Sequence, residues 1–177
     1  MDIIFINTHV EPLKILTSFL QYSSNQKKNK IIILDVFSVV TPESIIEELS
    51  FLSNYCQSLE IFKPIDPDDI IHFILDIKAM DKYRDTFLFV TDCPDAIPGR
   101  GLDYDYIFFL SLLKDTEVDK NLDVIVLYYI DDIDLIEKSM DILKLLPVIN
   151  DYYIFNAGSN PPFFKVSPYE SNPDVKE

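Results

Sequence analysis

The loop after the first apolar run of this sequence has the position of a phosphate-binding loop, but not the residue types. Ile3–Ile6 is predicted to form a strand, and residues 7–11 lead from it into a predicted helix at Pro12–Tyr22. A phosphate at such a helix start needs glycines, which let backbone N–H groups approach the anion. Residues 7–15 contain no glycine, and Glu11 places a negative charge where the phosphate would lie. We therefore expect no tight binding of a nucleoside triphosphate.

The histidines and cysteines do not form a recognisable catalytic or metal-binding motif. His9 lies in that first loop, without a serine, cysteine or second histidine close to it in the sequence. His72 is far away and falls within a predicted helix, so no histidine pair has the spacing of a zinc site. Cys56 and Cys93 fit no CxxC pattern, and we expect both to be reduced thiols.

Three aspartate clusters could suggest a metal site, but each falls at a predicted helix start. There, carboxylates cap free N–H groups and complement the helix dipole. A calcium loop would also need a glycine and a distal glutamate, and both are missing. We therefore predict no metal site, no cofactor and no catalytic residue. The clusters are Asp66, Asp68 and Asp69; Asp103 and Asp105; and Asp131, Asp132 and Asp134.

The elements that must position these residues alternate between strand and helix. Continuous apolar runs, typical of strands covered on both faces, are Ile3–Ile6, Ile31–Leu34, Phe87–Val90 and Val124–Tyr128, with a short edge strand at Leu59–Phe62. The helices are predicted at Pro12–Tyr22, at Pro42–Tyr55 with Ile45, Ile46, Leu49 and Leu52 inward, from Asp66 to about Met80, at Asp103–Leu113 and at Asp132–Lys144. This alternation predicts an α/β fold of three layers, with a mostly parallel sheet between helices on both faces.

The end of the chain changes character. Tyr152–Phe155 and Phe163–Val166 flank a loop rich in Asn, Gly and Pro, which predicts a C-terminal β-hairpin. We expect one domain over residues 1–169, and a polar, proline-containing tail at residues 170–177 that frays.

Charge and hydropathy limit the classes of partner. The net charge of −15 would repel a phosphate backbone, so we expect no autonomous nucleic-acid binding and favour a basic partner surface. Neither a signal peptide nor an apolar run of about 18 residues is present. We expect no membrane contact and an intracellular location, cytoplasmic or, in a eukaryote, nuclear.

Several short segments together resemble the RecA-like ATPase core, in particular RadA-type recombinases and their paralogs. Thr86–Asp92 has the form of a Walker B strand ending in aspartate. Thr41-Pro42-Glu43 is similar to the start of the next recombinase helix, and residues 99–102 (Gly-Arg-Gly-Leu) are similar to a stretch that follows Walker B. The likeness to KaiC-like ATPases is second. The resemblance implies a RecA-like, P-loop-type fold over most of the chain.

Compared with the family it resembles, the sequence lacks most residues of the nucleotide site. Lys14 matches the family's P-loop lysine, but Thr8 and Leu13 stand in place of its glycines and Ile15 in place of the magnesium-binding hydroxyl. Phe37 replaces the glutamate that activates water, and Tyr128 and Tyr129 fall near the polar sensor. The resemblance therefore implies a degenerate Walker A and a vestigial nucleotide site at Lys14, Asp35 and Asp92, in a pseudo-ATPase without phosphoryl transfer.

Our first hypothesis is a non-catalytic interaction or regulatory subunit in homologous recombination or DNA repair. By the resemblance, it would pair with another RecA-like subunit or with itself as a homodimer. Aromatic residues in excess of what one small core easily hides are candidates for the interface, or for packing under the hairpin. They include Tyr104, Tyr106, Phe108, Phe109, Tyr152, Tyr153, Phe163 and Phe164.

Two alternatives stay open. One is a KaiC-like regulatory protein that has lost its ATP site. The other is an enzyme or small-molecule-binding protein of another doubly wound family, with a ligand near His9, Asp35 and Asp92. A phospho-receiver domain with Asp35 or Asp92 as acceptor is a special case, which fits poorly because the acidic pair and the late lysine are missing.

Overall fold

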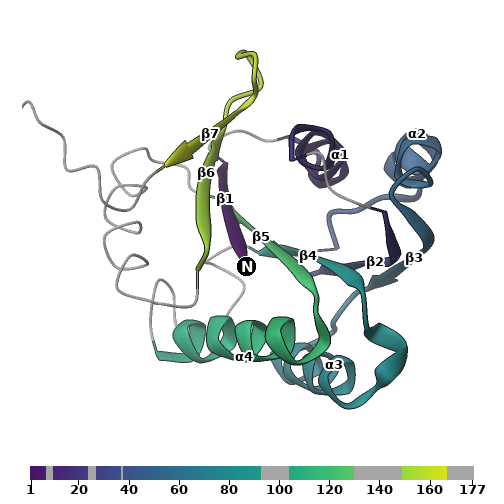
Figure 1. The fold of residues 1–177 in the computed structure, drawn as a ribbon, viewed down its shortest axis with the longest axis vertical. Coiled ribbons are helices and arrows are strands. Elements are labelled where there is room, and N and C mark those ends of the chain that lie inside the picture. Colours follow the sequence, from purple (N-terminus) through teal and green to yellow (C-terminus); the bar gives the residue numbers. More distant parts are fainter. Residues whose placement is uncertain (7–9, 24–26, 37, 93–103, 130–148, 167–177) are drawn as a thin grey trace, which may run out of the picture.

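The computed structural model describes residues 1–6, 10–23, 27–36, 38–92, 104–129 and 149–166 (Figure 1). In chain order the elements are β1 (Asp2–Ile6), α1 (Pro12–Tyr22), β2 (Lys28–Asp35), α2 (Pro42–Leu52), β3 (Cys56–Phe62), α3 (Pro67–Ala79), a 3-10 turn η1 (Asp81–Tyr83), β4 (Thr86–Asp92), α4 (Tyr104–Lys120), β5 (Asp123–Tyr129), β6 (Asp151–Phe155) and β7 (Phe163–Val166).

The described strands form one seven-stranded sheet in the order β3-β2-β4-β5-β1-β6-β7. Every neighbouring pair is parallel except β6 and β7, which are antiparallel. The predicted α/β class, the mostly parallel sheet, the edge position of β3 and the C-terminal strand pair are therefore confirmed. The architecture is consistent with a RecA-like, P-loop-type fold.

The strand order separates this fold from two other doubly wound types. In the Rossmann order 3-2-1-4-5-6 and the flavodoxin-like order 2-1-3-4-5, β1 and β2 are neighbours. Here β4 and β5 lie between β2 and β1. The phospho-receiver alternative requires the flavodoxin-like order, so the sheet contradicts it.

Helices cover both faces of the sheet (Figure 1). On one face, α1 and α2 bury Leu16, Phe19 and Leu52 in a cluster with the strands, and on the other face α3 and α4 contribute Ile74 and Leu113 to a second cluster. The central strands have core on both sides, which explains why their sequences are continuously apolar rather than alternating.

Helix α2 differs from its prediction in length and in rotation. It ends at Leu52 rather than at Tyr55. Of the four residues predicted to point inward, Leu52 is buried and Ile45 packs on the core, but Ile46 and Leu49 are exposed. The first turn explains the rotation. Thr41 and Ser44 cap each other reciprocally, which satisfies the Ser44 hydroxyl so that this residue can be buried against the sheet.

Some predictions lie outside the described residues. These are His9, Phe37, Cys93, residues 99–103, the helix Asp132–Lys144 with Asp131, Asp132 and Asp134, and the tail from residue 167. Helix α4 is described, and it continues to Lys120, well beyond the predicted end at Leu113. No helix in the described ranges is both long enough and apolar enough to cross a membrane.

Candidate functional site

The residues of interest gather at the carboxyl ends of the parallel strands. Asp35 ends β2 and Asp92 ends the neighbouring strand β4, while the loop from β1 leads to the start of α1. The helix after β2, α2, covers one face of the sheet, and the helix after β4, α4, covers the other, so β2 and β4 flank a switch in connection direction (Figure 1). Ligands of open α/β sheets bind at such points. The candidate nucleotide site therefore lies where ligand binding is expected for this fold class.

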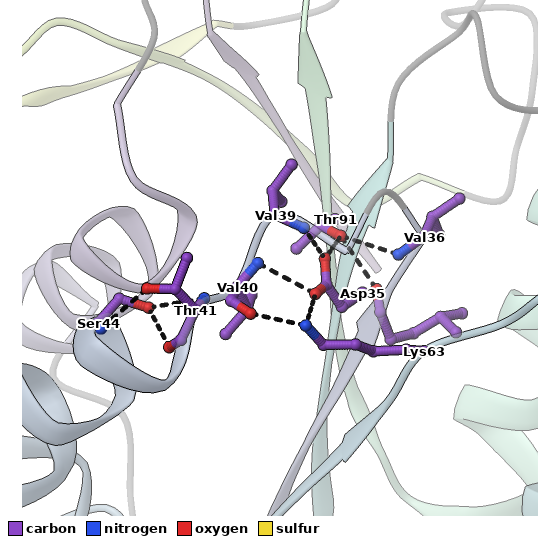
Figure 2. A network of polar contacts seen from close by, with 9 residues as sticks. Asp35, Val36, Val39, Val40, Thr41, Ser44, Lys63 and Thr91 are labelled. Carbon is purple, nitrogen blue, oxygen red and sulfur yellow. Dashed lines mark hydrogen bonds and ion pairs between the residues drawn. The ribbon is translucent and has the colours of Figure 1, made fainter.

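The Asp35 carboxylate is fully buried and its oxygens are occupied by the protein itself (Figure 2). Oδ1 accepts hydrogen bonds from the Val39 backbone N–H at 3.0 Å and from the Thr91 hydroxyl at 3.2 Å. Oδ2 accepts from the Val40 backbone N–H at 3.0 Å and lies 3.3 Å from Lys63 Nζ. A buried carboxylate with these partners is stable without a ligand.

The same contacts fix the loop between β2 and α2. The Thr91 hydroxyl accepts from the Val36 N–H at 3.1 Å, and Lys63 Nζ donates to the Val40 carbonyl at 2.7 Å. Ser38 takes a positive φ of 55° within this loop, and its N–H donates to the Asp35 carbonyl at 3.2 Å. The contacts of Asp35 with the backbone of residues 38–40 thus fix the loop that precedes the capping box of α2.

Sequence reasoning identified Asp35 but missed Thr91 and Lys63. Thr91 lies opposite Asp35 in the register of β4 against β2, and Lys63 follows the end of β3. The available signal was that all three residues stand at the ends of neighbouring strands. Only the strand order β3-β2-β4 brings them together.

The start of α1 is closed by a carboxylate. Glu11 is the N-cap residue, and its Oε2 accepts from the Lys14 backbone N–H at 3.1 Å. Pro12 occupies the first helical position and has no N–H to offer. The other carboxylate oxygen, Glu11 Oε1, is buried and has no hydrogen-bond partner among the described residues. The Lys14 N–H and the positive end of the helix dipole, which a phosphate would use, thus already face a negative side chain.

The three residues of the predicted nucleotide site do not contact one another among the described groups. Lys14 lies in the first turn of α1, and its Nζ is 3.6 Å from Glu47 on α2. Asp35 is paired with Lys63 instead. Asp92 ends β4 opposite Tyr128 on β5, and its side chain is outside the described part of the chain.

Two tyrosines end β5 between β4 and β1. Tyr128 is buried and packs edge-on against Phe5, with 5.6 Å between ring centroids. The Tyr129 hydroxyl donates to the Val10 carbonyl at 3.4 Å, which links β5 to the segment preceding α1. An aromatic core residue and a structural hydroxyl thus occupy the end of the strand beside Asp92.

The predicted interface aromatics divide into buried and exposed residues. Tyr152, Tyr153 and Phe163 are buried, and Phe109 is also in the core. Phe19 of α1 accounts for part of this burial, because its ring centroid lies 5.1 Å from that of Tyr153 and 5.2 Å from that of Phe163. Tyr153 and Phe163 of the β6–β7 pair therefore pack against α1, Tyr152 and Phe109 lie in the core on the other face, and Phe108 and Phe164 stay exposed. Tyr104 and Tyr106 lie in the first turn of α4, with side chains outside the described residues.

No group of three or more His, Cys, Asp or Glu side chains with the arrangement of a metal site occurs within the described ranges. Cys56 is buried with a free thiol, and burial raises the pKa of that thiol. His72 is exposed on α3.

Comparisons with known proteins identify the fold and no family. No family model matches the sequence, and no curated protein matches it. Among solved structures, the chain is similar to the structure described as "a unique ATP synthase subunit NeqB" from Nanoarchaeum equitans, with a TM-score of 0.56 and 13% sequence identity. The match covers 94% of this chain and 50% of that one, so this chain spans about half of its length.

Proposed function

We propose that this protein is a non-catalytic RecA-like pseudo-ATPase, which acts as an interaction or regulatory subunit. The partner is another RecA-like subunit or a second copy of the chain. Homologous recombination or DNA repair is the process that the resemblance to RadA-type recombinase paralogs implies.

The observation that carries this proposal is the Glu11 carboxylate at the start of α1. An incoming phosphate would have to displace Glu11 from the Lys14 N–H and would meet its negative charge at close range. Two unit charges about 4 Å apart interact by about 4 kcal/mol at the effective dielectric constant near a protein surface. The contact that stabilises a nucleotide in a working enzyme is repulsive here.

The Asp35 network supports the same conclusion. A phosphoryl-transfer enzyme keeps carboxylates at this edge available for magnesium and for the attacking water. The Asp35 oxygens instead hold two backbone N–H groups, one hydroxyl and one ammonium group. If the Asp35 oxygens bound a metal, the loop before α2 would lose the hydrogen bonds that fix it.

The structural neighbour supports the assembly part of the proposal. Its description names an ATP synthase subunit, which is a component of a multi-subunit machine. A RecA-like domain that keeps the sheet but closes its phosphate site can still offer surfaces to related subunits.

The proposal is tested by incubating the purified chain with ATP and magnesium and measuring the phosphate released from ATP. The mass of the chain is measured by light scattering in the same samples. We expect release at the rate of the protein-free blank, from the chain alone and at every protein concentration. Release that rises in proportion to protein concentration, and that falls in a Lys14→Ala variant, would show that the site is active and would overturn the proposal.

A further inference from the structure

Helix α2 carries an apolar stripe that no described element covers. Pro42, Ile46 and Leu49 follow one another at spacings of four and three residues, which places them on one side of the helix. All three are exposed, with 74% of Ile46 and 48% of Leu49 accessible to solvent. The spacing is the one through which a helix meets a partner helix.

The stripe faces away from the rest of the layer. Buried Ser44 and Leu52 mark the side of α2 that lies on the sheet, and Glu47, which pairs with Lys14, marks the side toward α1. At about 100° per residue, Ile46 and Leu49 lie on the remaining flank. In Figure 1, α2 stands at the outer end of its layer, above the edge strand β3 and its neighbour β2. Within the described ranges, no element therefore covers this flank.

Two further exposed apolar residues belong to the segments next to the start of α2. Val39 lies just before the helix, and Ile65 lies two residues after Lys63. Lys63 Nζ donates to the Val40 carbonyl at 2.7 Å, which ties the segment after β3 to the segment before α2. A partner segment could thus contact more length than α2 alone provides.

The helix that carries the stripe is acidic. Glu43, Glu47 and Glu48 all belong to α2, which contains no lysine or arginine. Within the described residues, one cation forms an ion pair with this helix, and that is Lys14 through Glu47. The whole chain carries a net charge of −15.

We propose that the α2 stripe, defined as Pro42, Ile46 and Leu49 with Glu43 beside it, docks an amphipathic helix of a partner protein whose apolar residues are flanked by lysine or arginine. This inference rests on the proposed function and names the surface and the chemistry of the partner. A second copy fits poorly, because it would bring the same carboxylates together and add its own charge of −15. Basic residues beside an apolar seam satisfy both features of the surface.

The test is a titration of the isotope-labelled chain followed by amide NMR shifts. The probe is a synthetic helical peptide of leucine and lysine, with leucine at helical spacing, and its leucine and glutamate counterpart is the charge control. We expect the lysine peptide to shift the amides of residues 39–53 and the glutamate peptide to leave them in place. Replacing both apolar residues, Ile46→Ser with Leu49→Ser, should weaken the lysine peptide about tenfold or more.

The matched control is Val118→Ser on α4, which removes a side chain that is 71% exposed but lies on the other face of the sheet. It should bind the lysine peptide as the unmodified chain does. Circular dichroism of each variant shows that it is folded, which is expected because the replaced side chains are exposed.

Equal affinity of the double variant and the Val118→Ser control would overturn the proposal, as would no binding to the unmodified chain or shifts centred outside α2. A dimer seen by light scattering and lost in the double variant would identify a second copy as the occupant and would also overturn it. None of these outcomes depends on whether the chain hydrolyses ATP. Failure of this inference is therefore distinguishable from failure of the proposed function.

Discussion

At the scale of single residues, the Asp35 carboxylate shows how a position at the functional edge of the sheet can be used for structure. Its negative charge is buried, and four groups from three loops or strand ends converge on it. A carboxylate kept for a ligand would leave at least one oxygen free. Asp35 therefore belongs to the framework of the β2–α2 loop.

Replacing Asp35 with asparagine should destabilise the protein by about 2–4 kcal/mol, because the amide turns an N–H group toward backbone N–H donors and removes the charge facing Lys63. Urea unfolding followed by circular dichroism measures this. Asp115→Asn on α4 is the matched control, since its carboxylate is 73% exposed and pairs with Lys78 at 3.7 Å. That variant should change stability by about 0.5 kcal/mol or less. Equal midpoints for the two variants would contradict the structural role of Asp35.

The sequence predicted part of this site for clear physical reasons. Asp35 and Asp92 follow apolar strands, and Glu11 precedes a helix that starts with proline, so their places could be derived from local pattern. Thr91 and Lys63 could not be found in this way. Their contacts with Asp35 span 56 and 28 residues and depend on strand order, which local pattern does not determine.

At the scale of elements, strands were easier to predict than the rotation of helices. A strand buried on both faces is apolar throughout, so its position can be read without knowing which side faces the core. Helix α2 has Ile45, Ile46, Leu49, Phe51 and Leu52 among eleven residues, so several of its faces are apolar. Burial of Ser44 in the capping box selects one of them and leaves Ile46 and Leu49 outside.

The junction of β1, β6 and α4 makes the stability of the folded state depend on pH. Asp2 of β1 stands opposite Asp151 of β6. Burial raises the pKa of Asp2 from 3.8 to about 6; the charges of Asp151 and Glu117 add to this, and the Met1 ammonium and Lys165 oppose it. The folded state therefore holds a proton on Asp2 between about pH 4 and pH 6 that the unfolded state releases.

The contribution of Asp2 to stability is thus present below about pH 4 and lost as the pH rises through about 6, by up to about 3 kcal/mol. Asp2→Asn imitates the protonated carboxyl and lacks this loss. Urea unfolding at pH 4 and at pH 7 should show a variant equal to the unmodified chain at the lower pH and more stable at the higher one. A difference between the two proteins that is the same at both pH values would contradict the buried, proton-binding carboxyl.

At the scale of the whole molecule, the fold favours nucleotide binding, whereas the residues at the candidate site disfavour it. The order of the parallel strands and the helices on both faces provide the frame in which a nucleotide would bind at the carboxyl edge. Inside that frame, Glu11 caps α1, Asp35 holds a loop and Tyr129 bonds to the carbonyl of Val10. These polar groups stabilise the fold without a nucleotide, which agrees with the proposed role of a protein that contributes surfaces rather than turnover.

The most direct test of this account is a calorimetric titration of ATP with magnesium into the purified chain. We expect no heat of binding up to about 1 mM nucleotide, because the start of α1 is closed by Glu11 and has no glycine-rich cradle. Glu11→Ala removes the capping carboxylate and serves as the companion variant, in which any weak anion binding should first appear. A one-to-one isotherm with a micromolar dissociation constant for the unmodified chain would mean that the site still binds phosphate, and would contradict the account of a closed nucleotide site.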